Sequence, residues 1–248
     1  MPSHSTPWLV RQPGGPRRFR LYCFPHAGGS ALNYRLWQSK LSPAIEVCAV
    51  QLPGRGQRMA ETPFSDMPSL VKALAPIIAQ QSHLPFAFFG HSMGALLAYE
   101  LARYCQLHAL PTPKALFVSG TAAPQHRSPS QDLHKMGDEQ LIEELATFNG
   151  TPPEVLQHKE LMEMVLPMLR ADFAMVETYQ YFPAPLLTMP ITVLVGKRDK
   201  RTSPEQADGW AKETSNLCRI QWFEGEHFFI NDEVDTVLDC ITSDLKEW

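Results

Sequence analysis

Six short, largely apolar runs punctuate the 248-residue sequence, and a glycine or proline follows each of them within a few residues. Segments with helical periodicity, such as Met67–Gln81 and Met93–Tyr104, lie between them. Runs that are apolar at nearly every position suit strands buried on both faces of a parallel sheet. Their alternation with helices predicts an α/β fold, with a mostly parallel central sheet flanked by helices. The predicted strands are Phe19–Phe24, Glu46–Val50, Phe86–Phe89, Ala115–Val118, Ile191–Val195 and Arg219–Phe223.

Residues 122–189 interrupt this alternation, because no strand pattern appears between their ends and a structureless linker of that length is uncommon. We expect a helical insertion, which could be a helix pair packed on the sheet or a lid over an active site. We favour the lid, because six of the ten methionines lie there and methionine adapts to flexible apolar ligands. The chain then divides into a core, 1–121 and 190–248, and a helical lid, 122–189. The two amphipathic faces are Leu141, Ile142, Leu145 and Phe148, and Val165, Leu166, Leu169, Phe173 and Val176.

Composition excludes several classes of protein. A formal charge of −4 and the lack of a long basic run argue against nucleic acid as a partner. The sequence contains no run of about eighteen apolar residues that could span a bilayer. Residues 1–5 lack the charged segment and following apolar run of a signal peptide. The five cysteines are widely spaced and form no CxxC pair, so we expect neither a disulfide framework nor a zinc site. These features together predict a cytoplasmic protein without membrane contact.

The pentapeptide Gly90-His91-Ser92-Met93-Gly94 follows an apolar strand and precedes a helical segment. A G-x-S-x-G pattern in this context is typical of a nucleophile elbow, whose sharp turn lifts the serine oxygen clear of its surroundings. The flanking glycines let neighbouring backbones approach closely. We therefore predict that Ser92 is the nucleophile of an acyl-bond hydrolysis, and that His91 supports the elbow rather than acting as the base.

A serine hydroxyl needs an imidazole to take its proton and a carboxylate to orient that imidazole. On this type of fold the acid and the base follow later strands, in the order serine, aspartate, histidine. Asp199 comes just after the fifth predicted strand and His227 just after the sixth, so we predict them as acid and base. A helix-capping aspartate and a packed loop histidine are the structural alternatives. Asp208, in a predicted helix, and Asp172, in the insertion, are set aside as acids.

The transition state of this reaction needs amide donors for a developing oxyanion. The N–H of Met93, at the start of the helix, can supply one. The loop Phe24–Gly29 can supply the other, and the N–H of Ala27 is our candidate, although a plain glycine-rich turn is the alternative. Phosphate-binding patterns of the form G-x-x-x-x-G-K-[ST] or G-x-G-x-x-G are absent, as is HExxH. We therefore expect no metal and no cofactor.

These residues together resemble the free-standing type II thioesterases, α/β-hydrolases that serve polyketide, nonribosomal peptide and some fatty acid synthases. The resemblance spans almost the whole chain in the expected order, and its Pro-Gly-Arg segment is more specific than the serine elbow. Glu226 departs from the family, which usually has glycine before the histidine. The segments that carry the resemblance are Phe24–Ser30, Gln51–Gly56, Phe88–Gly94 and Gly225–Phe229, with Gly196 and Asp199.

The resemblance implies a triad of Ser92, Asp199 and His227, with the amides of Ala27 and Met93 as the oxyanion hole. It implies as substrates acyl groups held as thioesters on the phosphopantetheine arm of acyl or peptidyl carrier proteins. It also implies an editing role in antibiotic assembly lines and a flexible lid at 122–189. Only about eighteen residues precede the first strand, too few for a carrier domain, so we expect the carrier to arrive in trans. We also expect the protein to be a monomer.

Two other functions remain open from the sequence: a general esterase or acyl-CoA hydrolase on the same scaffold, and a catalytically inactive hydrolase fold used as a binding module. The arginines near the N-terminus also allow two interpretations. Arg11, Arg17, Arg18 and Arg20 form either a solvated face or a docking surface for a partner, and an acidic carrier is the partner that Arg17, Arg18 and Arg20 could meet.

Overall fold

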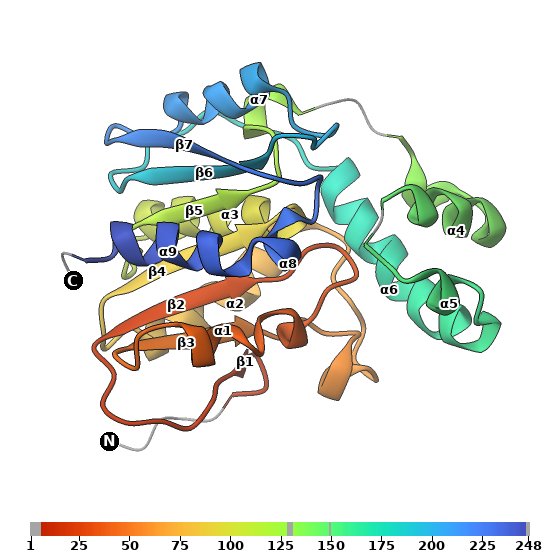
Figure 1. Ribbon diagram of the computed structural model, residues 1–248, viewed down its shortest axis with the longest axis horizontal. Coiled ribbons are helices and arrows are strands. Elements are labelled where there is room, and N and C mark those ends of the chain that lie inside the picture. The colour runs from red at the N-terminus through yellow and green to blue at the C-terminus, as the bar shows by residue number, and fades with distance from the viewer. Residues whose placement is uncertain (1–5, 128–130, 149, 247–248) are drawn as a thin grey trace.

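The computed structural model describes residues 6–127, 131–148 and 150–246, which build a seven-stranded sheet with helices on both faces (Figure 1). The strand order is β1-β3-β2-β4-β5-β6-β7. β1 pairs antiparallel with β3, and the other neighbouring pairs are parallel, which confirms the predicted α/β architecture. The strands are β1 (Leu9–Val10), β2 (Phe19–Phe24), β3 (Ile45–Val50), β4 (Phe86–His91), β5 (Leu116–Ser119), β6 (Ile191–Gly196) and β7 (Cys218–Phe223).

Two apolar cores lie on opposite faces of the sheet, which explains why the strands read as continuous apolar runs. Along β4, Phe86 and Phe88 face one core while Ala87 and Phe89 face the other. The first core is covered by α2 (Met67–Gln81), α3 (Met93–Leu107), α7 (Pro204–Asp208) and the 3-10 turn η5 (Gly209–Lys212), and the second by α1 (Trp37–Lys40), α8 (Phe229–Asp232), α9 (Val234–Asp244) and the 3-10 turn η1 (Ala31–Tyr34).

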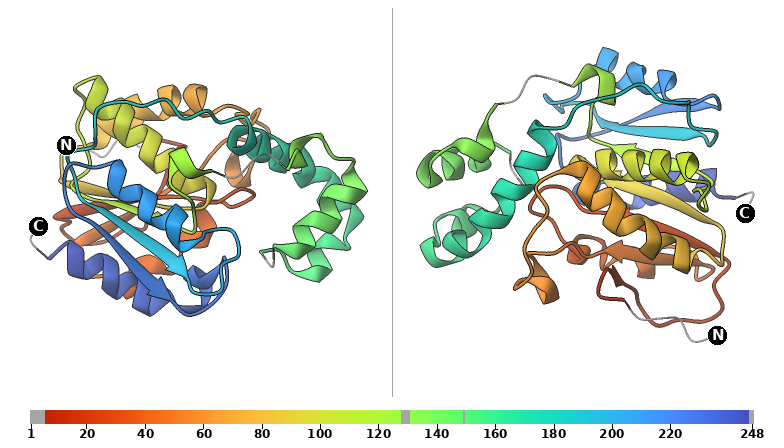
Figure 2. Two further views of the ribbon diagram at one scale, coloured as in Figure 1. Left: turned by 90° about the horizontal axis from the view of Figure 1, so that it is seen from above. Right: turned by 180° about the vertical axis from the view of Figure 1, so that it is seen from behind.

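Between β5 and β6 the chain leaves the sheet and forms a group of helices that projects from one side of the molecule (Figures 1 and 2). The group has a small apolar core of its own, which includes Leu141, Leu145, Leu166 and Leu169. Both predicted amphipathic helices are present there, whereas residues 128–130 and 149 of the predicted lid lie outside the described residues. Its elements are η4 (Leu133–Lys135), α4 (Asp138–Thr147), α5 (Pro153–Leu156) and α6 (Lys159–Glu177). η3 (Pro124–His126) instead packs against η5 beside the sheet, and η2 (Gly56–Arg58) lies between β3 and α2.

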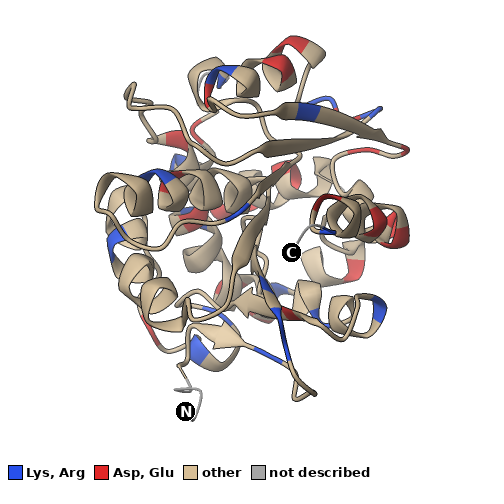
Figure 3. Cartoon of the chain, turned by 90° about the vertical axis from the view of Figure 1, so that its left-hand side faces the viewer, with Lys and Arg blue, Asp and Glu red and all other residues tan. Residues whose placement is uncertain are grey.

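Arg20 is not at the surface, so it belongs neither to a solvated face nor to a docking surface, which corrects its grouping with the other N-terminal arginines. Arg20 lies within β2, is 3% exposed, and donates from Nε to Oε2 of Glu46 on β3 at 2.5 Å. Arg17 donates to the carbonyl of Pro43, and with Arg18 it precedes β2, at the end of the sheet away from the helical projection. Figure 3, which faces that end, shows basic and acidic positions interspersed.

Within the described residues, no helix is both long enough and apolar enough to cross a bilayer. The predicted absence of a signal peptide concerns residues 1–5, which lie outside the described residues. The five cysteines are all free, and Cys23 and Cys48 are buried in the two cores.

Candidate active site

Ser92 stands at the corner between β4 and α3, with φ 54° and ψ −117°. A non-glycine residue with positive φ is strained, as expected at a nucleophile elbow. Both flanking glycines are required by space: a Cβ on Gly90 would lie 2.1 Å from the carbonyl oxygen of Gly94, and a Cβ on Gly94 would lie 2.1 Å from that of Phe24. The G-x-S-x-G pattern is therefore explained by backbone packing around the serine.

Asp199 and His227 come from the loops after β6 and β7 and meet at the carboxyl edge of the sheet. His227 Nδ1 donates to Oδ2 of Asp199 at 2.9 Å, and the amide of Arg201 donates to Oδ1 at 2.9 Å. The Asp199 side chain is fully buried, so these donors fix the carboxylate in place. Gly196 allows the two loops to touch, because a Cβ there would lie 2.5 Å from the carbonyl oxygen of Glu226.

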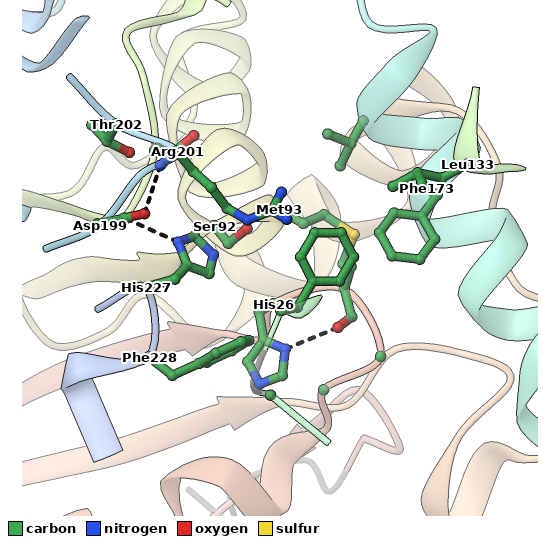
Figure 4. Close-up of a pocket in the computed structure, with 18 of the residues that line it drawn as sticks. His26, Ser92, Met93, Leu133, Phe173, Asp199, Arg201, Thr202, His227 and Phe228 are labelled. Atoms are coloured by element: carbon green, nitrogen blue, oxygen red, sulfur yellow. Dashed lines mark hydrogen bonds and ion pairs between the residues drawn. The ribbon is translucent and has the colours of Figure 1, made fainter. Parts of the chain in front are cut away.

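The His227 ring is drawn between Asp199 and Ser92 in Figure 4, and all three residues line one cavity. Because Nδ1 is engaged with the carboxylate, Nε2 is the ring nitrogen left for the serine. No hydrogen bond joins Ser92 to His227 in the described part of the chain. Such contacts in unliganded hydrolases are often long and tighten only in the substrate complex.

The loop after β2 carries the candidate oxyanion donor Ala27. His26 Nδ1 donates to the carbonyl of Ala27 at 2.9 Å, and the amide of Gly29 donates to the carbonyl of His26 at 2.9 Å. Among the described residues neither the Ala27 amide nor the Met93 amide has a hydrogen-bond acceptor, and both residues line the cavity. The two amides are thus available to a developing oxyanion.

His91, next to the nucleophile, is fully buried beneath the site and does not line the cavity. Its Nδ1 is hydrogen-bonded to Oγ of Ser119 at 2.9 Å, and its ring centroid lies 5.0 Å from that of His227. Burial, together with the neighbouring His227 and His26, holds the pKa of His91 well below its usual value. A neutral, packed His91 agrees with the supporting role expected from the sequence.

The cavity between the sheet edge and the helical projection has a volume of about 1820 Å³. That exceeds the size of typical small-molecule pockets and leaves room for a long, flexible substrate. The projection contributes a mostly apolar wall of this cavity. The wall includes Leu145, Phe148, Met162, Met168, Leu169 and Phe173. No group of three or more His, Cys, Asp or Glu side chains within the described ranges could hold a metal ion.

Sequence reasoning missed Asp172, which was set aside as a residue of the insertion. Asp172 is fully buried on α6 and pairs with Arg55. It also accepts a hydrogen bond from the amide of Gly28 in the loop Phe24–Gly29, hereafter called the oxyanion loop. Arg55 belongs to the Pro-Gly-Arg segment, and a buried arginine is stable only beside a negatively charged group. This requirement is the signal in the sequence that could have pointed to an acidic partner for Arg55.

Comparisons with known proteins agree with this geometry. The family described as "Thioesterase domain" matches residues 19–245. Gramicidin S biosynthesis protein GrsT of Aneurinibacillus migulanus is 39% identical over 245 residues, which cover 98% of this chain and 96% of GrsT.

Two solved structures extend the likeness to three dimensions. The type II thioesterase BorB from the borrelidin biosynthetic cluster has a TM-score of 0.90 and 39% identity, covering 97% of this chain and 98% of BorB. RedJ, a thioesterase of the prodiginine pathway of Streptomyces coelicolor, has a TM-score of 0.86 and 34% identity, covering 96% and 91%. These matches confirm the resemblance to the type II thioesterases and the α/β-hydrolase fold. The chain therefore belongs to the thioesterase family, whose members hydrolyse thioesters.

Proposed function

We propose that this chain is a serine thioesterase that releases acyl groups from the phosphopantetheine arms of carrier proteins in nonribosomal peptide or polyketide synthases. The observation that carries the proposal is the Asp199–His227 pair, which faces the same cavity as the strained Ser92 elbow. GrsT is named for gramicidin S biosynthesis, BorB belongs to the borrelidin cluster, and the similar type II thioesterase YbtT comes from the yersiniabactin NRPS/PKS pathway, which supports carrier-bound acyl groups as the substrate class. Removal of stalled or wrongly loaded acyl groups in trans is the editing role that follows.

The first half of the reaction forms an acyl-enzyme. Ser92 Oγ attacks the thioester carbonyl carbon while its proton passes to Nε2 of His227. The amides of Ala27 and Met93 donate to the oxyanion of the tetrahedral intermediate. The carbon–sulfur bond then breaks, and the pantetheine thiol leaves with the proton from His227.

The second half repeats these steps with water. His227 removes a proton from a water molecule, whose oxygen attacks the acyl-serine carbonyl. The ester bond to Ser92 breaks, the serine recovers its proton from His227, and the free acid leaves. Asp199 stabilises the imidazolium in both halves and holds the ring in one tautomer. This scheme uses no metal or cofactor, and we propose none.

The cavity supports a carrier-bound substrate. Its volume of about 1820 Å³ can hold a pantetheine arm together with an acyl group, and its lid wall is mostly apolar. We propose that the carrier stays outside and only its arm enters. The enzyme would work in the cytoplasm as a monomer, which size-exclusion chromatography with light scattering can check.

A general esterase or an acyl-CoA hydrolase is the alternative, because the same triad cleaves oxygen esters. The deciding experiment compares kcat/KM for one acyl group presented on a carrier protein, on coenzyme A and as a p-nitrophenyl ester. A clear preference for the carrier supports the proposal, whereas equal or higher values for the p-nitrophenyl ester overturn it. Fluorophosphonate labelling of the wild type, with Ser92→Ala as control, tests the nucleophile. An unlabelled wild type would favour a catalytically inactive binding module.

A further inference from the structure

A buried ion pair joins the lid to the core beside the oxyanion loop. Arg55, between β3 and η2, donates from Nη2 to Oδ1 of Asp172 at 2.7 Å and from Nη1 to Oδ2 at 2.8 Å. The side chains of Arg55 and Asp172 are 4% and 0% exposed. The two residues lie 117 positions apart in the chain, and Asp172 is on α6.

Two further hydrogen bonds of this pair go to the oxyanion loop, while Nε of Arg55 donates to the carbonyl of Pro53 at 3.3 Å. Oδ2 of Asp172 accepts from the amide of Gly28 at 2.8 Å, and Nη1 of Arg55 donates to the carbonyl of Gly29 at 3.0 Å. A buried ion pair adds little net stability compared with apolar side chains of similar volume. Its value here therefore lies in geometry, because it holds two consecutive residues of the loop from one side.

The hydrogen bonds to Asp172 and Arg55 restrain the backbone next to the Ala27 amide. The peptide unit between Ala27 and Gly28 is held at both ends: its carbonyl accepts from His26 Nδ1, and its amide donates to Asp172. Gly28 has φ +76°, and a Cβ there would lie 2.7 Å from Cδ2 of Leu169, also on α6. Rotation at Ala27, which would turn its N–H away from the cavity, is thus opposed by contacts from the lid.

We infer that Asp172 and Arg55 are positioning residues for the oxyanion hole, so that lid helix α6 forms part of the catalytic support. The inference rests on the proposed function, since it concerns the transition state of the same hydrolysis. Neither Arg55 nor Asp172 lines the cavity. Their effect reaches the reaction through the Ala27 amide.

The first test is Asp172→Asn, assayed with a small N-acetylcysteamine thioester that needs no carrier. Loss of one oxyanion donor costs about 100- to 1000-fold in kcat, so we expect misplacement of Ala27 to cost about 10- to 100-fold. KM for this substrate should change by less than about threefold, since ground-state binding does not use the oxyanion hole. The inhibition constant of a trifluoromethyl ketone, which forms a tetrahedral oxyanion adduct with serine, should rise in parallel with the loss of kcat/KM.

Asp172→Asn leaves Arg55 buried without its counter-charge and can unfold the protein, so a second variant separates stability from geometry. Arg55→Met combined with Asp172→Leu removes both charges, a replacement that is often neutral or stabilising. It also removes the acceptor for Gly28 and the donor for Gly29. We expect this double variant to keep its melting temperature and to lose kcat as Asp172→Asn does.

The matched control is Glu46→Gln, which breaks the Arg20–Glu46 pair at the far end of the sheet. Glu46→Gln should lower stability and leave kcat unchanged. Wild-type kcat in the double variant would overturn the inference, as would a double variant that fails to fold while Glu46→Gln folds. A wild type that neither hydrolyses thioesters nor reacts with a fluorophosphonate would instead overturn the proposed function.

Discussion

A substitution at Gly94 tests the geometry of the site without changing its reacting groups, because Gly94 carries no reacting atom. A Cβ at this position would lie 2.1 Å from the carbonyl oxygen of Phe24 and 2.7 Å from that of Pro25, where ordinary contacts begin at 3.4 Å. Both neighbours are backbone atoms, so in Gly94→Ala the elbow and the oxyanion loop must separate by more than about 1 Å. A displacement of that size costs about 100-fold in rate.

The Gly94→Ala prediction is checked by kcat with a small thioester, measured well below the melting temperature. Overpacking of this kind costs about 1–3 kcal/mol, so we also expect the melting temperature to fall by several degrees. Gly137→Ala is the control, since its Cβ would meet nothing within 4 Å and its φ is −60°. If Gly94→Ala kept the kcat and the melting temperature of the control, the close approach of the two loops would not be what shapes the site.

Three further predictions address the acid, the buried histidine and the N-terminal arginines. Asp199→Asn should lower kcat by about 10⁴-fold at neutral pH by favouring the wrong tautomer of His227, and near-wild-type kcat would place the acid elsewhere. Folding lowers the pKa of His91, so near pH 6 and below the unfolded chain binds a proton at this residue that the folded protein does not bind. The free energy of unfolding should therefore fall as pH drops below about 6.5, by up to about 1.4 kcal/mol per pH unit. In His91→Gln this contribution should disappear, so the free energy of unfolding from urea denaturation should change less between pH 7 and pH 5 than in the wild type. The same pH dependence in both proteins would contradict a lowered pKa of His91. Arg17→Glu with Arg18→Glu should leave KM for carrier-bound substrate unchanged, whereas a rise confined to that substrate would restore a docking role.

The strands were predictable because burial on both faces leaves a continuous apolar signature. All six predicted strands are present, with ends displaced by at most two residues. β1 escaped prediction since two residues at an edge leave no pattern. Arg20 was misplaced because it was grouped with its neighbours in the chain, although its position inside a strand buried on both faces should have put it in the interior.

The site was predictable to the extent that it follows chain order. Ser92, Asp199 and His227 each come just after a strand of a parallel sheet, so topology alone brings them to one edge. Asp172 could not be found that way, since it lies inside a helix and its partner Arg55 is in a distant loop. Only the packing of α6 against the core reveals the contact.

The lid meets the core through contacts of unequal strength. The Asp172 carboxylate accepts three hydrogen bonds, two from Arg55 and one from the amide of Gly28, and moving α6 away would break all three together. Phe148, at the end of α4, instead lies 3.6 Å beneath the guanidinium of the exposed Arg201, and such a contact is worth only about 0.5–1 kcal/mol. We propose that the projection moves as a lid to admit a carrier arm, and we expect this movement to break the Phe148 contact first and to leave Asp172 on the oxyanion loop. The cavity can then open at α4 while the amide of Ala27 stays in place.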